Sequence, residues 1–177
     1  MKFYLSDTNK IVRMFAYFIE IFVLTVLQNV PGLTMPIFSC TPLLSVAAAL
    51  SIALIETEMP SMEIALIAGL LIDVTTATPF GSFAMFFIVI CAITSAFVQG
   101  KRRKDSFWLI LTSVIAMVLT FLALWFILSV AKGSSDSILQ LKQKFIPTGI
   151  YTLFVMPFTY TLNNIIHKLL KNRDDAN

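Results

Sequence analysis

Charged, metal-binding and disulfide-forming residues are all scarce in this chain. Asp, Glu, Lys and Arg make up 13% of its 177 residues, whereas a soluble globular domain carries roughly a quarter. One histidine and two cysteines offer no disulfide framework and few metal ligands, so no haem, iron–sulfur or zinc cofactor is expected. With 58% hydrophobic residues and a mean hydropathy of +0.86, a soluble enzyme and a disordered chain are excluded. The net charge of +3 is too small to favour nucleic acid as a partner.

Runs without charge divide the chain into membrane spans. Residues 21–55, 74–100, 106–131 and 145–166 contain no Asp, Glu, Lys or Arg, and a span needs about 20 apolar residues. The first run is interrupted by Pro31-Gly32, Pro36 and Pro42, which indicates two helices and a turn. We therefore predict an all-α integral membrane protein with a single transmembrane domain over residues 1–177. Its six helices are expected at about 11–30, 39–56, 62–78, 82–99, 107–131 and 147–168.

The basic residues indicate the orientation, because cytoplasmic flanks carry the excess of Lys and Arg. Six crossings with both termini in the cytoplasm place ten of the 13 basic residues inside. These are Lys2, Lys10, Arg13, Lys101, Arg102, Arg103, Lys104, Lys168, Lys171 and Arg173. Residues 132–146 then form an outer loop, which is either a short amphipathic helix or a solvated connector.

Two acidic residues fall inside predicted spans, where charge is costly and often functional. Asp73 shares one helix face with Ala65, Gly69 and Ala77, since these positions differ by four residues, and small residues permit close helix approach. We expect Asp73 to point into a helix–helix seam, where it is either protonated or accepts bonds from Ser, Thr, Asn or Tyr side chains of a neighbouring span. It would then be a polar tether between helices or to a partner helix. A proton or ion site is the alternative. Glu20 is expected to face inward or toward a partner.

The remaining polar residues suggest no catalytic chemistry. Glu56, Glu58 and Glu63 are expected to form a solvated acidic turn on the inner side, and Asn163, Asn164 and His167 to be interfacial. Cys40 and Cys91 are expected to be small packing residues. Since no Ser-His-Asp set, HExxH motif or phosphate-binding glycine loop is present, an enzyme is not expected.

Residues 65–97, ALIAGLLIDVTTATPFGSFAMFFIVICAITSAF, resemble the signature region of the MreD family of rod shape-determining membrane proteins. That family has a Gly, an Asp four residues later and a Gly eight residues after that, and Gly69, Asp73 and Gly81 reproduce this spacing. The sequences around Pro31 and Pro42, and Pro157 followed by a basic tail, are also similar to the family's pattern. The acidic or amide residue and the aromatics often found beside the second of these prolines are absent here.

The resemblance implies a non-enzymatic scaffold subunit of the cell-elongation machinery in the bacterial cytoplasmic (inner) membrane. Members of the family bind MreC, a single-span protein, and act with RodA, a transpeptidase and the MreB filament in lateral peptidoglycan synthesis. Ala65, Gly69, Asp73, Ala77 and Gly81 would then shape the bundle.

Two other functions fit the same architecture. The substrate-binding component of an energy-coupling-factor vitamin transporter is also a small basic protein with six spans, and the MreD resemblance includes a similar overall fold. Such components tend to carry an Ala-x-x-x-Ala motif in the first span, whereas here Ala49 and Ala53 place it in the second. A minimal channel or carrier would depend on Asp73 and Glu20 alone.

Overall fold

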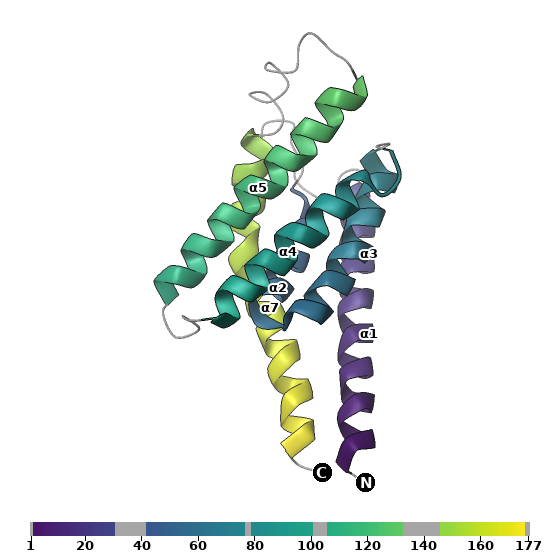
Figure 1. The fold of residues 1–177 in the computed structure, drawn as a ribbon, viewed down its shortest axis with the longest axis vertical. Helices are drawn as coiled ribbons and strands as arrows, with labels where there is room; N and C mark the ends of the chain where they lie inside the picture. Colours follow the sequence, from purple (N-terminus) through teal and green to yellow (C-terminus); the bar gives the residue numbers. More distant parts are fainter. Residues whose placement is uncertain (1, 31–41, 77–78, 101–105, 133–145, 176–177) are drawn as a thin grey trace.

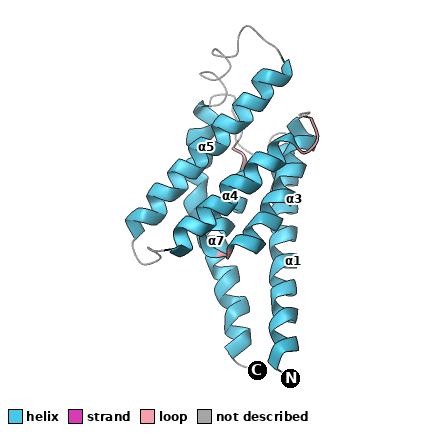
Figure 2. Ribbon diagram, in the orientation of Figure 1, coloured by secondary structure: helices cyan, strands magenta, loops and turns pink. Residues whose placement is uncertain are grey.

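The computed structural model describes residues 2–30, 42–76, 79–100, 106–132 and 146–175, and over these ranges it contains helices and turns but no strands (Figure 2). The all-helical prediction is therefore confirmed for this part of the chain. Its six helices are α1 Lys2–Asn29, α2 Leu44–Ile55, α3 Glu58–Thr76, α4 Ser82–Gly100, α5 Ser106–Lys132 and α7 Ile146–Asp175. Cys40, the basic cluster 101–104 and the predicted outer-loop helix within 133–145 lie outside the described residues.

Four of these helices are long and apolar enough to cross a membrane. The qualifying segments are Ile11–Asn29, Glu58–Thr76, Ser82–Gln99 and Trp108–Leu128. At 1.5 Å per residue each extends about 27 Å or more, close to the thickness of the hydrocarbon core. They include α3, which begins at Glu58 and not at the predicted residue 62.

Helix α2 lies at the centre of the bundle and is shorter than predicted. Its twelve residues extend about 18 Å, and ten of them, from Ser45 to Leu54, are buried. It contacts α1, α3, α4, α5 and α7, and its alanines allow these helices to approach closely. The predicted start at residue 39 is wrong for the described part, because Pro42 and Leu43 precede the helix in a non-helical conformation.

Helix α7 is the other element outside the four apolar spans. It is 30 residues long, contains Pro157 and packs mainly against α2. Figure 1 shows that its last turns and the first turns of α1 lie at the same end of the molecule and extend beyond the other helices. The described part of the chain thus begins and ends on one side of the bundle.

Apolar side chains face outward as well as inward. Tyr17, Phe83 and Phe87 are fully buried, and the last two rings stack with centroids 5.3 Å apart. Met85 and Phe154 are 73% and 76% exposed, and large exposed apolar residues occur along every long helix. A soluble monomer rarely exposes so much apolar surface, so a lipid environment fits this surface.

Candidate functional site

Gly69 allows α3 and α4 to pack at close range. These two helices make the most extensive contact in the described bundle. A Cβ atom at position 69 would lie 2.5 Å from Ala84 Cα and 2.9 Å from Ala84 Cβ, which is closer than such atoms approach. Only glycine therefore permits this spacing. Ala65, one turn earlier on α3, is fully buried, whereas Ala77 lies outside the described residues.

The turn between α3 and α4 depends on the second glycine of the motif. Gly81 has φ of +85°, in the left-handed region that residues with a Cβ atom rarely adopt. Its position immediately before Ser82 allows the chain to reverse direction and enter α4. The glycine thus meets a backbone requirement.

Asp73 caps the start of α4. Its carboxylate accepts hydrogen bonds from the backbone N–H groups of Gly81 at 2.9 Å, Phe83 at 3.1 Å and Ala84 at 3.3 Å. The first N–H groups of a helix have no partner within that helix, and a negative charge is favourable there. The donors in these three bonds are backbone N–H groups at the start of the adjacent helix. The Gly69–Asp73–Gly81 motif therefore builds a helical hairpin.

A second polar cluster, centred on Glu56, joins four helices. Glu56 Oε1 lies 2.9 Å from Arg13 Nε in an ion pair and 2.9 Å from His167 Nδ1. The same oxygen accepts a hydrogen bond of 3.0 Å from the Tyr17 hydroxyl. Arg13 and Tyr17 belong to α1 and His167 to α7, so one carboxylate links the first and last helices to the end of α2.

The main chain of Glu56 adds the fourth helix. Its carbonyl oxygen accepts hydrogen bonds from Ser95 Oγ at 2.8 Å and Gln99 Nε2 at 2.7 Å, both on α4. The last carbonyls of a helix need partners outside it, and α4 provides them for α2. The cluster lies toward the end of the bundle where α1 begins and α7 ends.

The prediction of a solvated acidic turn is wrong for Glu56 and correct for its neighbours. Glu56 is 4% exposed, whereas Glu58 and Glu63 are exposed. The difference arises because Glu56 is the residue immediately after α2 and its side chain contacts α1 and α7. Its partners Tyr17 and His167 are 39 and 111 residues away, so sequence spacing gave no signal for the cluster.

Two amide side chains fasten α2 at other points. Gln28 Oε1 accepts hydrogen bonds from the backbone N–H of Ser45 at 3.2 Å and from its hydroxyl at 3.1 Å, which caps the start of α2. The prediction that Asn163 is interfacial is wrong, because this residue of α7 is fully buried and donates to Ser51 Oγ. Polar bonds of this kind hold helices together in lipid, where hydrophobicity does not.

Glu20 differs from the other acidic residues in the described spans. Both of its carboxylate oxygens are buried, and neither finds a hydrogen-bond partner among the described residues. The residue itself is half-buried and lies at the centre of the segment Ile11–Asn29. This location is about 14 Å from either end of that segment.

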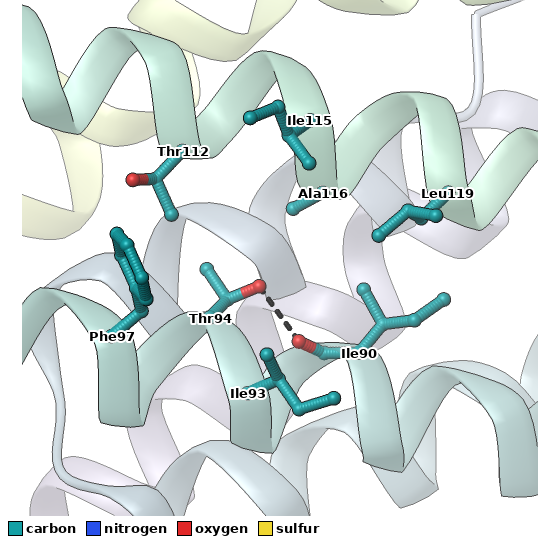
Figure 3. A pocket seen from close by; sticks show the side chains of 8 residues that line it. All are labelled: Ile90, Ile93, Thr94, Phe97, Thr112, Ile115, Ala116 and Leu119. Atoms are coloured by element: carbon teal, nitrogen blue, oxygen red, sulfur yellow. Dashed lines mark hydrogen bonds between the residues drawn. The ribbon is translucent and has the colours of Figure 1, made fainter.

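The cavities between the helices are mainly apolar. One, of about 160 Å³, lies between α4 and α5 and is lined by Ile90, Ile93, Thr94, Phe97, Thr112, Ile115, Ala116 and Leu119 (Figure 3). The Thr94 hydroxyl is occupied by a hydrogen bond of 2.7 Å to the Ile90 carbonyl. Another cavity, between α5 and α7, is lined largely by Val, Leu, Ile, Met and Phe side chains. Such walls suit hydrocarbon better than a polar solute.

Comparison with known proteins finds no matching family model, no matching curated protein and no matching solved structure.

Proposed function

We propose that this protein is a non-enzymatic scaffold subunit of the bacterial cell-elongation complex, embedded in the cytoplasmic membrane. It would act by binding the transmembrane helix of an MreC-like protein and thereby organise lateral peptidoglycan synthesis. RodA, a transpeptidase and MreB would belong to the same complex. The observation that carries the proposal is the hairpin in which Gly69, Asp73 and Gly81 each meet a distinct backbone requirement.

The hairpin geometry supports the proposal because it gives the MreD-like motif a physical meaning. The first glycine permits helix contact, the aspartate caps the next helix, and the second glycine forms the turn between them. Changing the spacing would separate the cap from the helix start that it serves. The motif thus specifies a shape for the bundle, which would act on partners through its helix faces.

The polar contacts of the bundle also favour a scaffold. The carboxylates of Asp73 and Glu56 are occupied by bonds between helices. Bonds of this kind hold the helices in a fixed arrangement, as a binding surface requires. The mainly apolar walls of the cavities give the vitamin-transporter alternative no support.

The proposed topology has six crossings and both termini in the cytoplasm. It is supported by the common location of the start of α1 and the end of α7 (Figure 1). It is also supported by the ten basic residues that this arrangement puts on one side, in agreement with the positive-inside rule.

The test is affinity purification of the tagged protein from its native membrane in a mild detergent, followed by mass spectrometry. We expect an MreC-like protein to be enriched, with RodA or a transpeptidase, over a purification from cells expressing an unrelated tagged six-span protein. Recovery of paired ATPases with a transmembrane coupling subunit and a bound vitamin would overturn the proposal in favour of transport.

A further inference from the structure

Helix α1 is the least covered of the four apolar spans. Only 17% of its spanning window is buried within the molecule, compared with 33–39% for the other three. It lies along one edge of the bundle (Figure 1) and packs against α2, α3 and α7. Much of its surface is therefore open to lipid or to another helix.

One side of α1 carries the residue pattern of a helix–helix seam. Val12, Ala16, Ile19, Val23 and Val26 follow one another at alternating steps of four and three residues, and we refer to them as the α1 seam. This is the spacing of core positions in a coiled coil, where β-branched side chains pack well. The four larger residues are 46–48% exposed, so this chain leaves the seam unfilled. A strip of small and β-branched residues lets a second helix approach closely.

Glu20 lies directly beside the α1 seam. It follows Ile19 and is one turn before Val23. In a coiled coil, a side chain at this position flanks the core and contacts the partner helix. One turn before it, Tyr17 faces the bundle interior. The half-buried Glu20 side chain thus lies at the border between the packed and the open faces of α1. Its carboxylate oxygens are buried in this chain, so a donor on a partner helix reaches them only if the side chain turns toward the seam.

A carboxyl group at mid-membrane depth needs a hydrogen-bond donor. No described residue supplies one to Glu20, and an unsatisfied polar group in hydrocarbon is costly. From the open seam and the adjacent acid, we propose that the α1 seam binds one transmembrane helix of a partner protein that brings a hydrogen-bond donor to Glu20. The donor would be Lys, Arg, His or an amide or hydroxyl side chain. A second copy of α1 would bring another glutamate to the same depth, so self-association meets this need less well.

This inference rests on the proposed function, since the single helix of the MreC-like protein is the occupant to be tested. The experiment places a photo-crosslinking amino acid at Val23 in cells that coexpress the two proteins. The matched control position is Phe126 on α5, which is 56% exposed compared with 46% for Val23. We expect an adduct with the partner's transmembrane peptide from Val23 and a much weaker one from Phe126.

Substitutions of Glu20 then test the donor. Glu20→Leu should lower the yield of the Val23 adduct about three- to tenfold, the range expected from one hydrogen bond between membrane helices. Glu20→Gln should retain most of it, because an amide still accepts a hydrogen bond. Ile19→Trp should abolish the adduct, because the larger side chain blocks the exposed seam. This variant tests the seam independently if Glu20→Leu does not accumulate to the normal level.

Three results would overturn the inference: an adduct with a second copy of this chain or with lipid alone, equal yields from Val23 and Phe126, or an adduct insensitive to both Glu20→Leu and Ile19→Trp. If the MreC-like protein copurifies but crosslinks only from Phe126, the inference fails and the proposed function stands. If the Val23 adduct contains the helix of a different protein and depends on Glu20, the proposed function fails and the α1 seam stands.

Discussion

At the scale of single residues, the hairpin between α3 and α4 depends on two glycines and one aspartate. Gly69 and Gly81 act through the lack of a Cβ atom, one in a helix contact and the other in a turn. Asp73 acts through two oxygens that serve three backbone donors. We therefore expect substitutions of these three residues to have different effects.

Gly69→Ala should destabilise the protein. The added methyl group would meet the backbone of Ala84, which cannot give way as a flexible side chain can, so α3 and α4 must separate. Overpacking of this kind costs about 1–3 kcal/mol. The free energy of unfolding, measured by SDS titration in mild-detergent micelles, checks the value.

Gly149→Ala is the matched control, since a Cβ atom there would lie 3.7 Å from the Phe121 ring in ordinary contact. Both substitutions replace a helical glycine, Gly69 inside α3 and Gly149 in the first turn of α7. Such a replacement by itself favours a helix interior by about 1 kcal/mol. An equal effect at the two positions would show that the contact with Ala84 does not limit the packing of α3 and α4.

Asp73→Leu should be more harmful than Asp73→Asn. Leucine removes every acceptor from the start of α4, whereas asparagine keeps one oxygen and is itself a good capping residue. Loss of a cap costs about 0.5–2 kcal/mol, and the buried N–H groups of Phe83 and Ala84 add to this cost. Unfolding measurements and complementation of a strain lacking the gene should rank wild type, Asn and Leu in that order. Full complementation and normal accumulation of Asp73→Leu would remove the case for the cap.

At the scale of elements, α2 owes its central position to contacts at both of its ends. Gln28 of α1 caps its start. At its other end, Glu56 follows the helix and is bonded to α1, α4 and α7. Such a short helix gains little from its own propensity, so packing and these end contacts must fix it.

Glu56→Leu should therefore loosen α1 and α7 together. It leaves Arg13 and His167 without their shared carboxylate, and breaking a buried ion pair costs about 3–5 kcal/mol. The loss of free energy of unfolding caused by Glu56→Leu should fall near the lower limit of this range. The Arg13 side chain is 17% exposed and can turn toward water. The double variant Arg13→Met, Glu56→Leu should lose less than the sum of the two single variants.

Glu63→Leu provides the control for this experiment, since Glu63 is an exposed acid on the adjacent helix. Its free energy of unfolding should stay within about 0.5 kcal/mol of the wild-type value. Additive effects of the Arg13 and Glu56 substitutions would mean that the two side chains do not interact as the distance indicates.

The helices were predictable from the sequence to a greater extent than the polar clusters. Charge-free runs and prolines located five of the six described helices, because hydrophobic length is a local property. The third predicted span contains Glu63 and Asp73 and was favoured by the distribution of basic residues. The start of α2 was misplaced by five residues, since Pro42 does not reveal where the helix begins after it. The Asp73 cap joins residues eight to eleven positions apart and was partly foreseen as a tether. The Glu56 cluster joins α2 to residues of α1, α4 and α7 that are 39 to 111 positions away, and only the folded bundle brings them together.

At the scale of the whole molecule, apolar side chains occupy both the core and the outside, and several polar side chains are buried. Asp73, Glu56, Asn163 and Ser51 are buried, while phenylalanines and isoleucines cover the outside. In lipid the apolar exterior needs no protein cover, and the buried polar bonds and close alanine and glycine contacts hold the helices together. The number of crossings then depends on α2 and α7, the two helices outside the four apolar spans. The length of α2, about 18 Å, is less than the hydrocarbon thickness of about 30 Å.

Reporter fusions test this topology. Green fluorescent protein attached at the C-terminus should fluoresce, because six crossings return the chain to the cytoplasm. Alkaline phosphatase fused after Phe80, in the turn between α3 and α4, should be active outside, and the same enzyme fused after Thr57, between α2 and α3, should be inactive. An active fusion at Thr57 would mean that the chain does not cross back before α3. The basic residues near the two termini would then lie on opposite sides of the membrane, contrary to the charge distribution that led to the six-span arrangement.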